Sequence, residues 1–304
     1  MFKGELIERI KILKEEKGIL ILAHYYVDGI IQELADFVGD SYYLSKIAKD
    51  RKENIILFCG VSFMGESAKI LSPHKKVIVP TLDAKCPMAF MVNEEKVNEI
   101  KTNYDDLAVV CYINSTAEIK GFSDVCVTSS NAYNIVKNLK EKNIYFIPDN
   151  NLGRYLATKL PNKNFIFNEG YCPIHQNLKK DDILKVKEVH KNAEILVHPE
   201  CKLEVLELAS FIGSTSGIID YATKSEGDEF IICTEMGILH ELITKNPFKK
   251  FHSVIPEQIC PDMKKITLEA VYNALNTLTP EILLEKHIEM KAVKSLEKMH
   301  ELGR

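Results

Sequence analysis

Three cysteines share one short sequence context, and they are the side chains best suited to hold a metal. Each directly precedes a proline, as Cys86-Pro87, Cys172-Pro173 and Cys260-Pro261. Three thiolates without a fourth fit a [4Fe–4S] cluster with one open iron, because ordinary electron-transfer clusters take four cysteines. An open iron is a Lewis acid that can bind a hydroxyl or carboxylate and assist the loss of water. The pattern therefore indicates a cluster that acts on a substrate.

Two other interpretations of these cysteines stay open. A closed tetrahedral zinc site would need a fourth ligand such as His175, close after Cys172. The three cysteines could also be buried structural residues, although we favour the cluster over both. The other five look different: four lie inside apolar runs and are expected to be core residues, while Cys201 could line the site but is expected to pack behind it. The four are Cys59, Cys111, Cys126 and Cys233.

A second set of candidate residues consists of hydroxyls that stand where a helix could begin. Ser41, Ser129 and Thr215 each follow a short apolar run. A hydroxyl with free backbone N–H groups at a helix N-terminus can bind an anion. If the three face one axis, they could hold a substrate with two carboxylates and a phosphate. The alternative is that they are three ordinary N-caps.

Polar residues at the ends of apolar runs could supply proton transfer. His24 and His198 end two such runs, Asn114 ends a third, and Glu200 follows His198 by two positions. Histidine titrates near neutral pH, and a partly buried glutamate can be tuned into a general base. We therefore expect His24, His198 and Glu200 to belong to the site.

These residues recur because the chain repeats itself three times. The polar strand-end residue and the hydroxyl are separated by 17, 15 and 17 positions, and the hydroxyl and the cysteine by 45, 43 and 45. Between them lie apolar strands, turns expected at Gly65, Gly153 and Gly237, and helices. Such alternation predicts short parallel sheets covered on both faces.

The fold class predicted is α/β, with three small pseudo-threefold-related domains arranged in a triangle around a central site. Ligands of open α/β sheets bind at the carboxyl ends of strands, so the three Cys-Pro loops should converge there. The predicted repeats span 18–103, 104–190 and 191–272, with flanking helices within 1–17 and 273–304. A helix is expected over 3–16, and another from Pro280 to about residue 302, capped by Thr279.

Composition excludes several classes of function. The 304 residues include 39 Lys and Arg against 43 Asp and Glu, a net charge of −4, which argues against a nucleic-acid binder. No apolar run is long enough to span a bilayer, and the charged N-terminus does not resemble a secretory signal. Eight cysteines without a CxxC pair then indicate reduced thiols in the cytoplasm. We expect no nucleic-acid partner and no membrane partner.

Taken together, the ordered motifs resemble quinolinate synthase, the second enzyme of de novo NAD biosynthesis. The resemblance covers roughly residues 15–275. It rests on AHYY (23–26), GDS (39–41), VPTLDAKCPMA (79–89), YINST (112–116), TSSNA (128–132), GYCPIH (170–175), HPEC (198–201), GST (213–215), TEMG (234–237) and Cys260 followed by MKKITLE (263–269).

The resemblance implies a triangular pseudo-threefold protein with a [4Fe–4S] cluster on Cys86, Cys172 and Cys260. It implies condensation of iminoaspartate with dihydroxyacetone phosphate to quinolinate, releasing phosphate and water, and a functional link to an aspartate oxidase or dehydrogenase. It places catalytic groups at His24, Tyr26, Tyr112, His198 and Glu200, and substrate-binding groups at Ser41, Asn114, Ser129 and Thr215. The alternatives are a radical iron–sulfur enzyme of the diphthamide-synthesis type, with similar architecture, and a non-catalytic carrier of a metal cluster.

Overall fold

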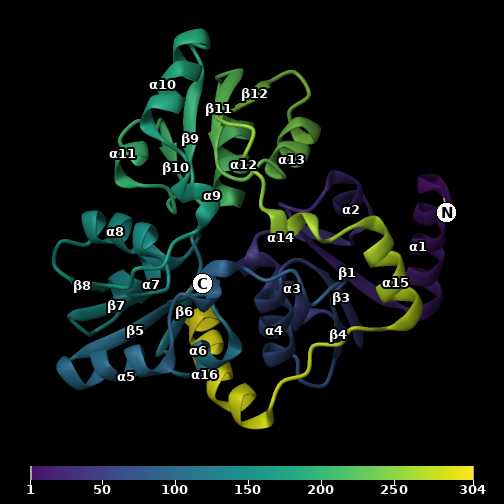
Figure 1. Cartoon of the computed structure of the whole chain (residues 1–304), viewed down its shortest axis with the longest axis horizontal. Helices are drawn as coiled ribbons and strands as arrows, with labels where there is room; N and C mark the ends of the chain where they lie inside the picture. Colours follow the sequence, from purple (N-terminus) through teal and green to yellow (C-terminus); the bar gives the residue numbers. More distant parts are fainter. Residues whose placement is uncertain (1, 304) are drawn as a thin grey trace.

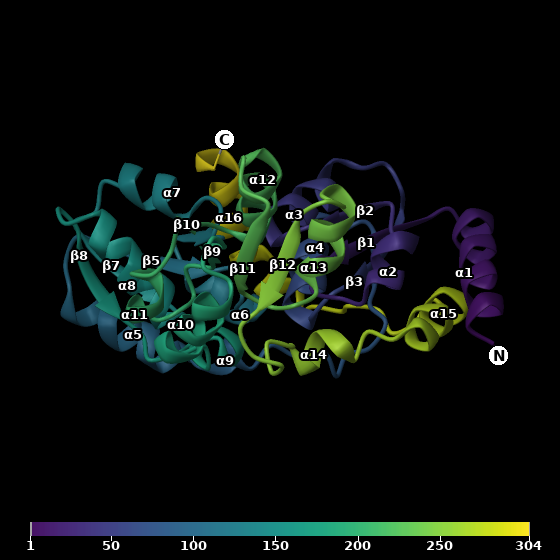
Figure 2. The ribbon, with the colours of Figure 1, turned by 90° about the horizontal axis from the view of Figure 1, so that it is seen from above.

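Three four-stranded parallel sheets form the framework of the computed structural model, which describes residues 2–303. The sheets form three lobes around a common centre, and helices cover their faces (Figure 1). Seen from the side, the lobes lie in one flattened layer (Figure 2). The predicted α/β class with three small parallel-sheet units is confirmed.

The elements follow the same order in each lobe. The first lobe contains β1 Ile19–His24, α2 Gly29–Leu34, β2 Phe37–Gly39, α3 Ser41–Asp50, β3 Ile55–Cys59, α4 Ser62–Leu71, β4 Lys76–Ile78 and the short 3-10 helix η1 Pro87–Phe90. The second contains α5 Glu94–Asn103, β5 Leu107–Tyr112, α6 Ala117–Gly121, β6 Val125–Val127, α7 Ala132–Asn138, β7 Asn143–Ile147, α8 Asn150–Lys159, β8 Asn164–Phe167 and α9 Pro173–Gln176. The third contains α10 Lys180–Val189, β9 Glu194–Val197, α11 Leu203–Leu206, β10 Phe211–Ile212, α12 Thr215–Lys224, β11 Glu229–Cys233, α13 Ile238–Lys245, β12 Lys250–Ser253 and α14 Pro261–Lys264.

Three further helices flank the lobes: α1 Lys3–Lys17, α15 Leu268–Thr277 and α16 Lys286–Leu302. In each sheet the first strand lies between the second and the third, and the fourth lies at the edge, giving β2-β1-β3-β4, β6-β5-β7-β8 and β10-β9-β11-β12. All residues of β1 are buried, as expected for a central parallel strand covered on both faces. Within residues 2–303, no helix is long and apolar enough to cross a membrane.

A lysine closes the end of one helix in every lobe, a repeat that the sequence analysis missed. Lys75 Nζ donates to the carbonyls of Ala48 and Arg51, at 2.7 and 2.5 Å, just where α3 ends. Lys163 and Lys249 make the same pairs of bonds at the ends of α7 and α12. A lysine there satisfies carbonyls that have no partner within the helix.

Two local expectations were wrong. Gly65 and Gly153 lie inside α4 and α8 rather than in turns. A Cβ on Gly65 would come within 2.9 Å of Val79, and one on Gly153 within 3.0 Å of Phe146, so glycine allows close packing of helix on sheet. Gly237 does stand at the start of its helix, as the N-cap of α13.

The C-terminal helix also begins later than expected, at Lys286 instead of Pro280. The chain first runs along the edge strand β4, where Ile282 donates its N–H to Val77 at 2.8 Å and Pro280 accepts from Val79 at 3.1 Å. Pairing this edge strand satisfies backbone groups that a helix from Pro280 would leave open. By contrast, α1 agrees with the predicted helix over 3–16 and buries Leu6 and Ile10.

We expect Lys75→Met to lower the free energy of unfolding by about 1–3 kcal/mol, because it leaves two carbonyls without their donor in a buried place. Lys75 is 2% exposed, whereas Lys52 nearby is exposed. Urea unfolding followed by circular dichroism measures the change, with Lys52→Met as the control. Equal stability of the two variants would contradict this account of the repeated lysine.

Candidate active site

One central cavity collects every site residue predicted from the sequence. It lies at the carboxyl ends of the strands, where open α/β sheets bind their ligands. The predicted residues that line it are His24, Tyr26, Ser41, Cys86, Tyr112, Asn114, Ser129, Cys172, His198, Glu200, Thr215 and Cys260. The structure brings them together, while their individual roles stay predictions.

The hydroxyls and the cysteines reach the cavity from opposite sides. In Figure 2, α7 and α12 lie toward the upper edge of the molecule, and α9 and α14, which follow Cys172 and Cys260, lie toward the lower edge. The three cysteines are each the N-cap of a short helix whose first residue is proline. The helices that follow the hydroxyls and those that follow the cysteines therefore approach the cavity from opposite edges of the molecule.

The hydroxyls are not the N-caps of their helices, so that alternative is wrong. Asp40 caps α3 by accepting the N–H of Tyr43 at 3.0 Å, and Ser214 caps α12 by accepting that of Gly217 at 3.2 Å. Asn131 occupies the cap position of α7. Because other residues hold the helix ends, Ser41 and Thr215 line the cavity without serving as caps.

Tyr26 connects the first and third lobes through its hydroxyl. It shares hydrogen bonds of 2.9 Å with Thr215 Oγ1 and with Thr234 Oγ1. Thr234 Oγ1 in turn lies 2.9 Å from His175 Nε2, which belongs to the loop after Cys172. Burial raises the pKa of Tyr26 and of Tyr112 well above the usual value, so both phenols keep their protons.

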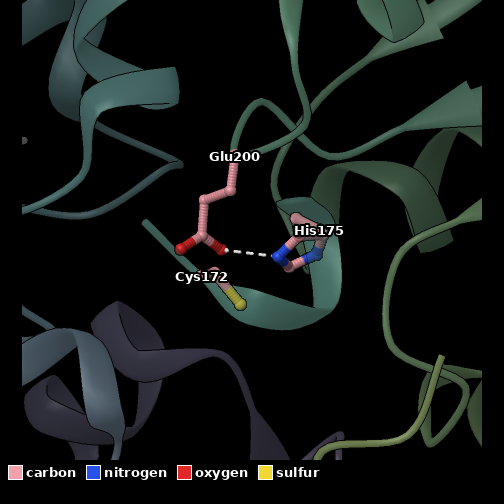
Figure 3. Close-up of side chains that lie close together, drawn as sticks. All are labelled: Cys172, His175 and Glu200. Carbon is pink, nitrogen blue, oxygen red and sulfur yellow. Dashed lines mark ion pairs between the residues drawn. The ribbon is translucent and has the colours of Figure 1, made fainter. Parts of the chain in front are cut away.

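Glu200 is a buried carboxylate between two imidazoles. Its Oε2 lies 3.3 Å from His175 Nδ1 and 3.2 Å from His198 Nδ1, and the two rings stack with centroids 4.7 Å apart. Figure 3 shows His175 facing Glu200 beside the thiol of Cys172. The other oxygen, Oε1, is buried and makes no hydrogen bond within residues 2–303, so it can receive a group from a bound molecule.

Opposing effects set the charge state around Glu200. Burial raises its pKa, but His175, His198 and Tyr112 favour the carboxylate more strongly, and the net direction is downward. Burial lowers the pKa of His24 to about 3 and that of His175 to about 4. The cavity therefore holds an anionic Glu200 beside a neutral His175 at neutral pH.

The thiols are suited to a cation rather than to nucleophilic attack. Burial raises the pKa of Cys86 to about 12, that of Cys260 to about 11, and that of Cys172 well above its usual value. A bound metal reverses this preference, because it stabilises the thiolate. Cys172, His175 and Glu200 also place one potential ligand atom each within 4.8 Å of the other two.

The remaining cysteines lie in the core. Cys201 is fully buried and does not line the cavity, as expected, and the other four strand cysteines are also fully buried. All eight cysteines are free thiols.

The sequence analysis did not identify Asp40 and Glu235 as cavity residues, and it considered His175 only as a zinc ligand. Asp40 belongs to the GDS motif and Glu235 to the TEMG motif. Both could have been found as polar residues at strand-to-helix turns in the repeats.

A second group of potential ligands, His190, Glu229 and His252, lies outside the cavity. Both rings approach Glu229 Oε1, at 2.9 and 3.0 Å. The rings stack face to face with centroids 3.6 Å apart, so one ion could not lie in the planes of both. The arrangement is that of two imidazoles hydrogen-bonded to one carboxylate.

The repeated lobes, together with thiols, imidazoles and a carboxylate in one cavity, define an α/β enzyme with a central active site. A family model described as quinolinate synthetase A protein matches residues 8–301. Quinolinate synthases from Clostridioides difficile and Caldicellulosiruptor saccharolyticus are each 54% identical to this chain, over 98% and 97% of both chains respectively. A quinolinate synthase from Fusobacterium nucleatum is 52% identical over 97% of this chain and 99% of its own. The chain belongs to the quinolinate synthetase A family, which confirms the resemblance.

Because the pKa of His24 is lowered to about 3 in the folded chain, the unfolded state binds more protons below pH 6.5. We therefore expect the free energy of unfolding to fall as the pH drops from 6.5, by about 2 kcal/mol at pH 5 from this residue alone. In His24→Asn the fall should be smaller. Urea unfolding of the metal-free chain at each pH measures it, with exposed His74→Asn as the control. Identical pH profiles for His24→Asn and the unaltered chain would contradict burial of a neutral His24.

Proposed function

We propose that this protein is a quinolinate synthase that condenses iminoaspartate with dihydroxyacetone phosphate. The products are quinolinate, one phosphate and two waters, which balances the atoms of the two substrates. Membership of the family and the names of its close relatives support the activity. One observation carries the proposal: all three Cys-Pro loops open into the same cavity as Glu200 and the three hydroxyls.

We further propose that Cys86, Cys172 and Cys260 hold a [4Fe–4S] cluster. The three thiols suit the group because each occupies the same place in its lobe and each lines the one cavity. A single zinc on Cys172, His175 and Glu200 would leave two of the repeated thiols without a role. When bound, the cluster would supply a Lewis acid that polarises a hydroxyl or carboxylate for loss of water.

The other end of the cavity suits the anionic parts of both substrates. Ser41 and Thr215 begin the ten-residue helices α3 and α12, whose N-termini attract carboxylate and phosphate groups. Ser129 and Asn114 add a hydroxyl and an amide from the second lobe. These groups would bind and orient the substrates beside Glu200.

Glu200 is the best candidate for moving protons along the three-carbon part of the substrate. It is anionic, its Oε1 is free, and it lies beside two imidazoles. Tyr26 and Tyr112 keep their protons and can donate to developing oxyanions. His24 accepts the N–H of Tyr26 through Nδ1 at 3.2 Å, which leaves the Nε2 proton of a neutral ring as a donor.

The diphthamide-type radical enzyme and the cluster carrier have less support. Neither explains the named relatives, and a carrier has no need for the buried Glu200 and tyrosines. We also propose that iminoaspartate comes from an aspartate-oxidising enzyme, because a free imine hydrolyses readily. Eight free thiols fit work in the reducing cytoplasm.

Cys86→Ser, Cys172→Ser and Cys260→Ser should each abolish the brown colour, the bound iron of a complete cluster and the formation of quinolinate. A weak hydroxyl ligand cannot replace the thiolate. Anaerobic purification, iron analysis and the visible spectrum measure this. Cys59→Ser and Cys233→Ser, in the core, are the controls and should keep their iron. Full iron content in Cys172→Ser would refute the three-ligand assignment.

Glu200→Gln should lower turnover by about 10²–10⁴-fold, because the amide keeps the shape but loses the base. Thr215→Ala should instead mainly raise KM, if its hydroxyl holds ground and transition states alike. Steady-state quinolinate assays separate the two, and Glu204→Gln, an exposed residue of the same lobe, is the control. Unchanged turnover in Glu200→Gln with iron retained would remove Glu200 from the catalytic groups.

A further inference from the structure

Two buried carboxylates hold the polypeptide at two of the three cavity cysteines. Asp149 Oδ2 accepts the backbone N–H of Cys172 at 3.3 Å, and Glu235 Oε1 accepts that of Cys260 at 3.1 Å. Asp149 is 0% exposed and Glu235 is 1% exposed. The bonds reach the ligand residues themselves, so the carboxylates act directly on the loops that present the thiols.

The two carboxylates occupy one position of the repeat, although they come from different residue types. A backbone bond marks this position in every lobe: Ser62 donates to Ala84, Asn150 to Gly170 and Met236 to Gln258, at 2.8, 2.7 and 2.8 Å. In each case the acceptor lies two residues before the cavity cysteine. The residue before the donor is Val61, Asp149 or Glu235, so the first lobe has an apolar side chain where the others have a carboxylate.

Each carboxylate uses both of its oxygens, which makes an isosteric amide a poor substitute. Asp149 Oδ1 also accepts the N–H of Leu152 at 2.7 Å, and Glu235 Oε2 accepts that of Gly237 at 2.5 Å. The side chain therefore ties the start of α8 or α13 to the cysteine loop. An amide has one acceptor oxygen and would set its NH₂ against one of the two N–H donors.

We propose that Asp149 and Glu235 are positioning residues that fix the Cys172 and Cys260 loops for metal binding, while Val61 leaves the Cys86 loop without such a tie. The inference rests on the proposed role of the three cysteines as ligands. The pseudo-threefold site is then asymmetric, because two of the three cysteine loops are hydrogen-bonded to an acidic side chain at the strand-to-helix turn and the Cys86 loop is not. Loss of either hydrogen bond should increase the mobility of one cysteine loop only.

The test is hydrogen–deuterium exchange of the full anaerobic protein, read at the amides of the three cysteines by mass spectrometry. In the unaltered protein we expect the Cys172 and Cys260 amides to exchange at least about fivefold more slowly than that of Cys86, the effect of one ordinary hydrogen bond. This measurement needs no variant, so it remains decisive if a substitution prevents folding. Equal exchange at the three amides would overturn the proposal.

Asp149→Asn should speed exchange at Cys172 by at least about fivefold and leave Cys260 and Cys86 unchanged. Glu235→Gln should do the same at Cys260 alone. Both variants should also release iron to a chelator several-fold faster. Asp124→Asn is the control, because Asp124 likewise accepts a backbone N–H, that of Val109 at 2.7 Å, and neither residue lines the cavity that contains Cys86, Cys172 and Cys260.

Equal acceleration at all three cysteines in either variant would mean general loosening and would overturn the proposal, as would no change at the targeted amide. These results differ from a failure of the proposed function. If Cys172→Ser kept all its iron, the ligand assignment would fall, whereas the exchange pattern would still report whether the carboxylates hold the loops.

Discussion

The burial of one carboxylate, Glu200, is the interaction on which the centre of the molecule depends. A carboxylate withdrawn from water is stable only when other groups replace its hydration, and here two imidazoles and a phenol do so. His198 comes from the same strand end, but His175 comes from the loop that carries Cys172, and Tyr112 from the second lobe. Holding Glu200 thus requires the second and third lobes to meet at one place, and the contact with His175 brings the Cys172 loop to it.

The hydrophobic core does not join the three lobes equally. The first two lobes share one continuous core, which also includes residues of α1, α15 and α16. The third sheet has two separate apolar clusters on its faces, and only a few outside residues, such as Tyr25 and Tyr155, join them. The third lobe therefore meets the others largely through polar contacts such as Tyr26 with Thr215 and Thr234. Polar residues of the site therefore also hold the third lobe against the first.

Repetition explains both the regularity and the asymmetry of the site. The backbone follows the same course three times, with a lysine closing a helix and a proline after each cysteine. The side chains within that frame have diverged: Tyr26 and Thr116 stand at the positions equivalent to Glu200, and Val61 stands where Asp149 and Glu235 hold their loops. A substrate with two different halves requires such divergence, because equivalent positions must bind unlike groups.

The sequence alone determined the repeat, the α/β class and many of the residues that line the cavity, since strand ends and turns in parallel sheets occupy fixed places relative to the sheet. It could not determine contacts between lobes, which join residues far apart in the chain. The partnership of His175 with Glu200 is of this kind. The hydrogen bonds from Cys172 to Asp149 and from Cys260 to Glu235 each lie within one lobe, but they also join residues 23 and 25 positions apart. The sequence analysis also placed the start of α16 too early. Pro280 and Ile282 form backbone hydrogen bonds along the edge of β4, and local helix signals do not reveal these partners. Periodicity records which face of an element is buried, whereas only tertiary structure decides what it is buried against.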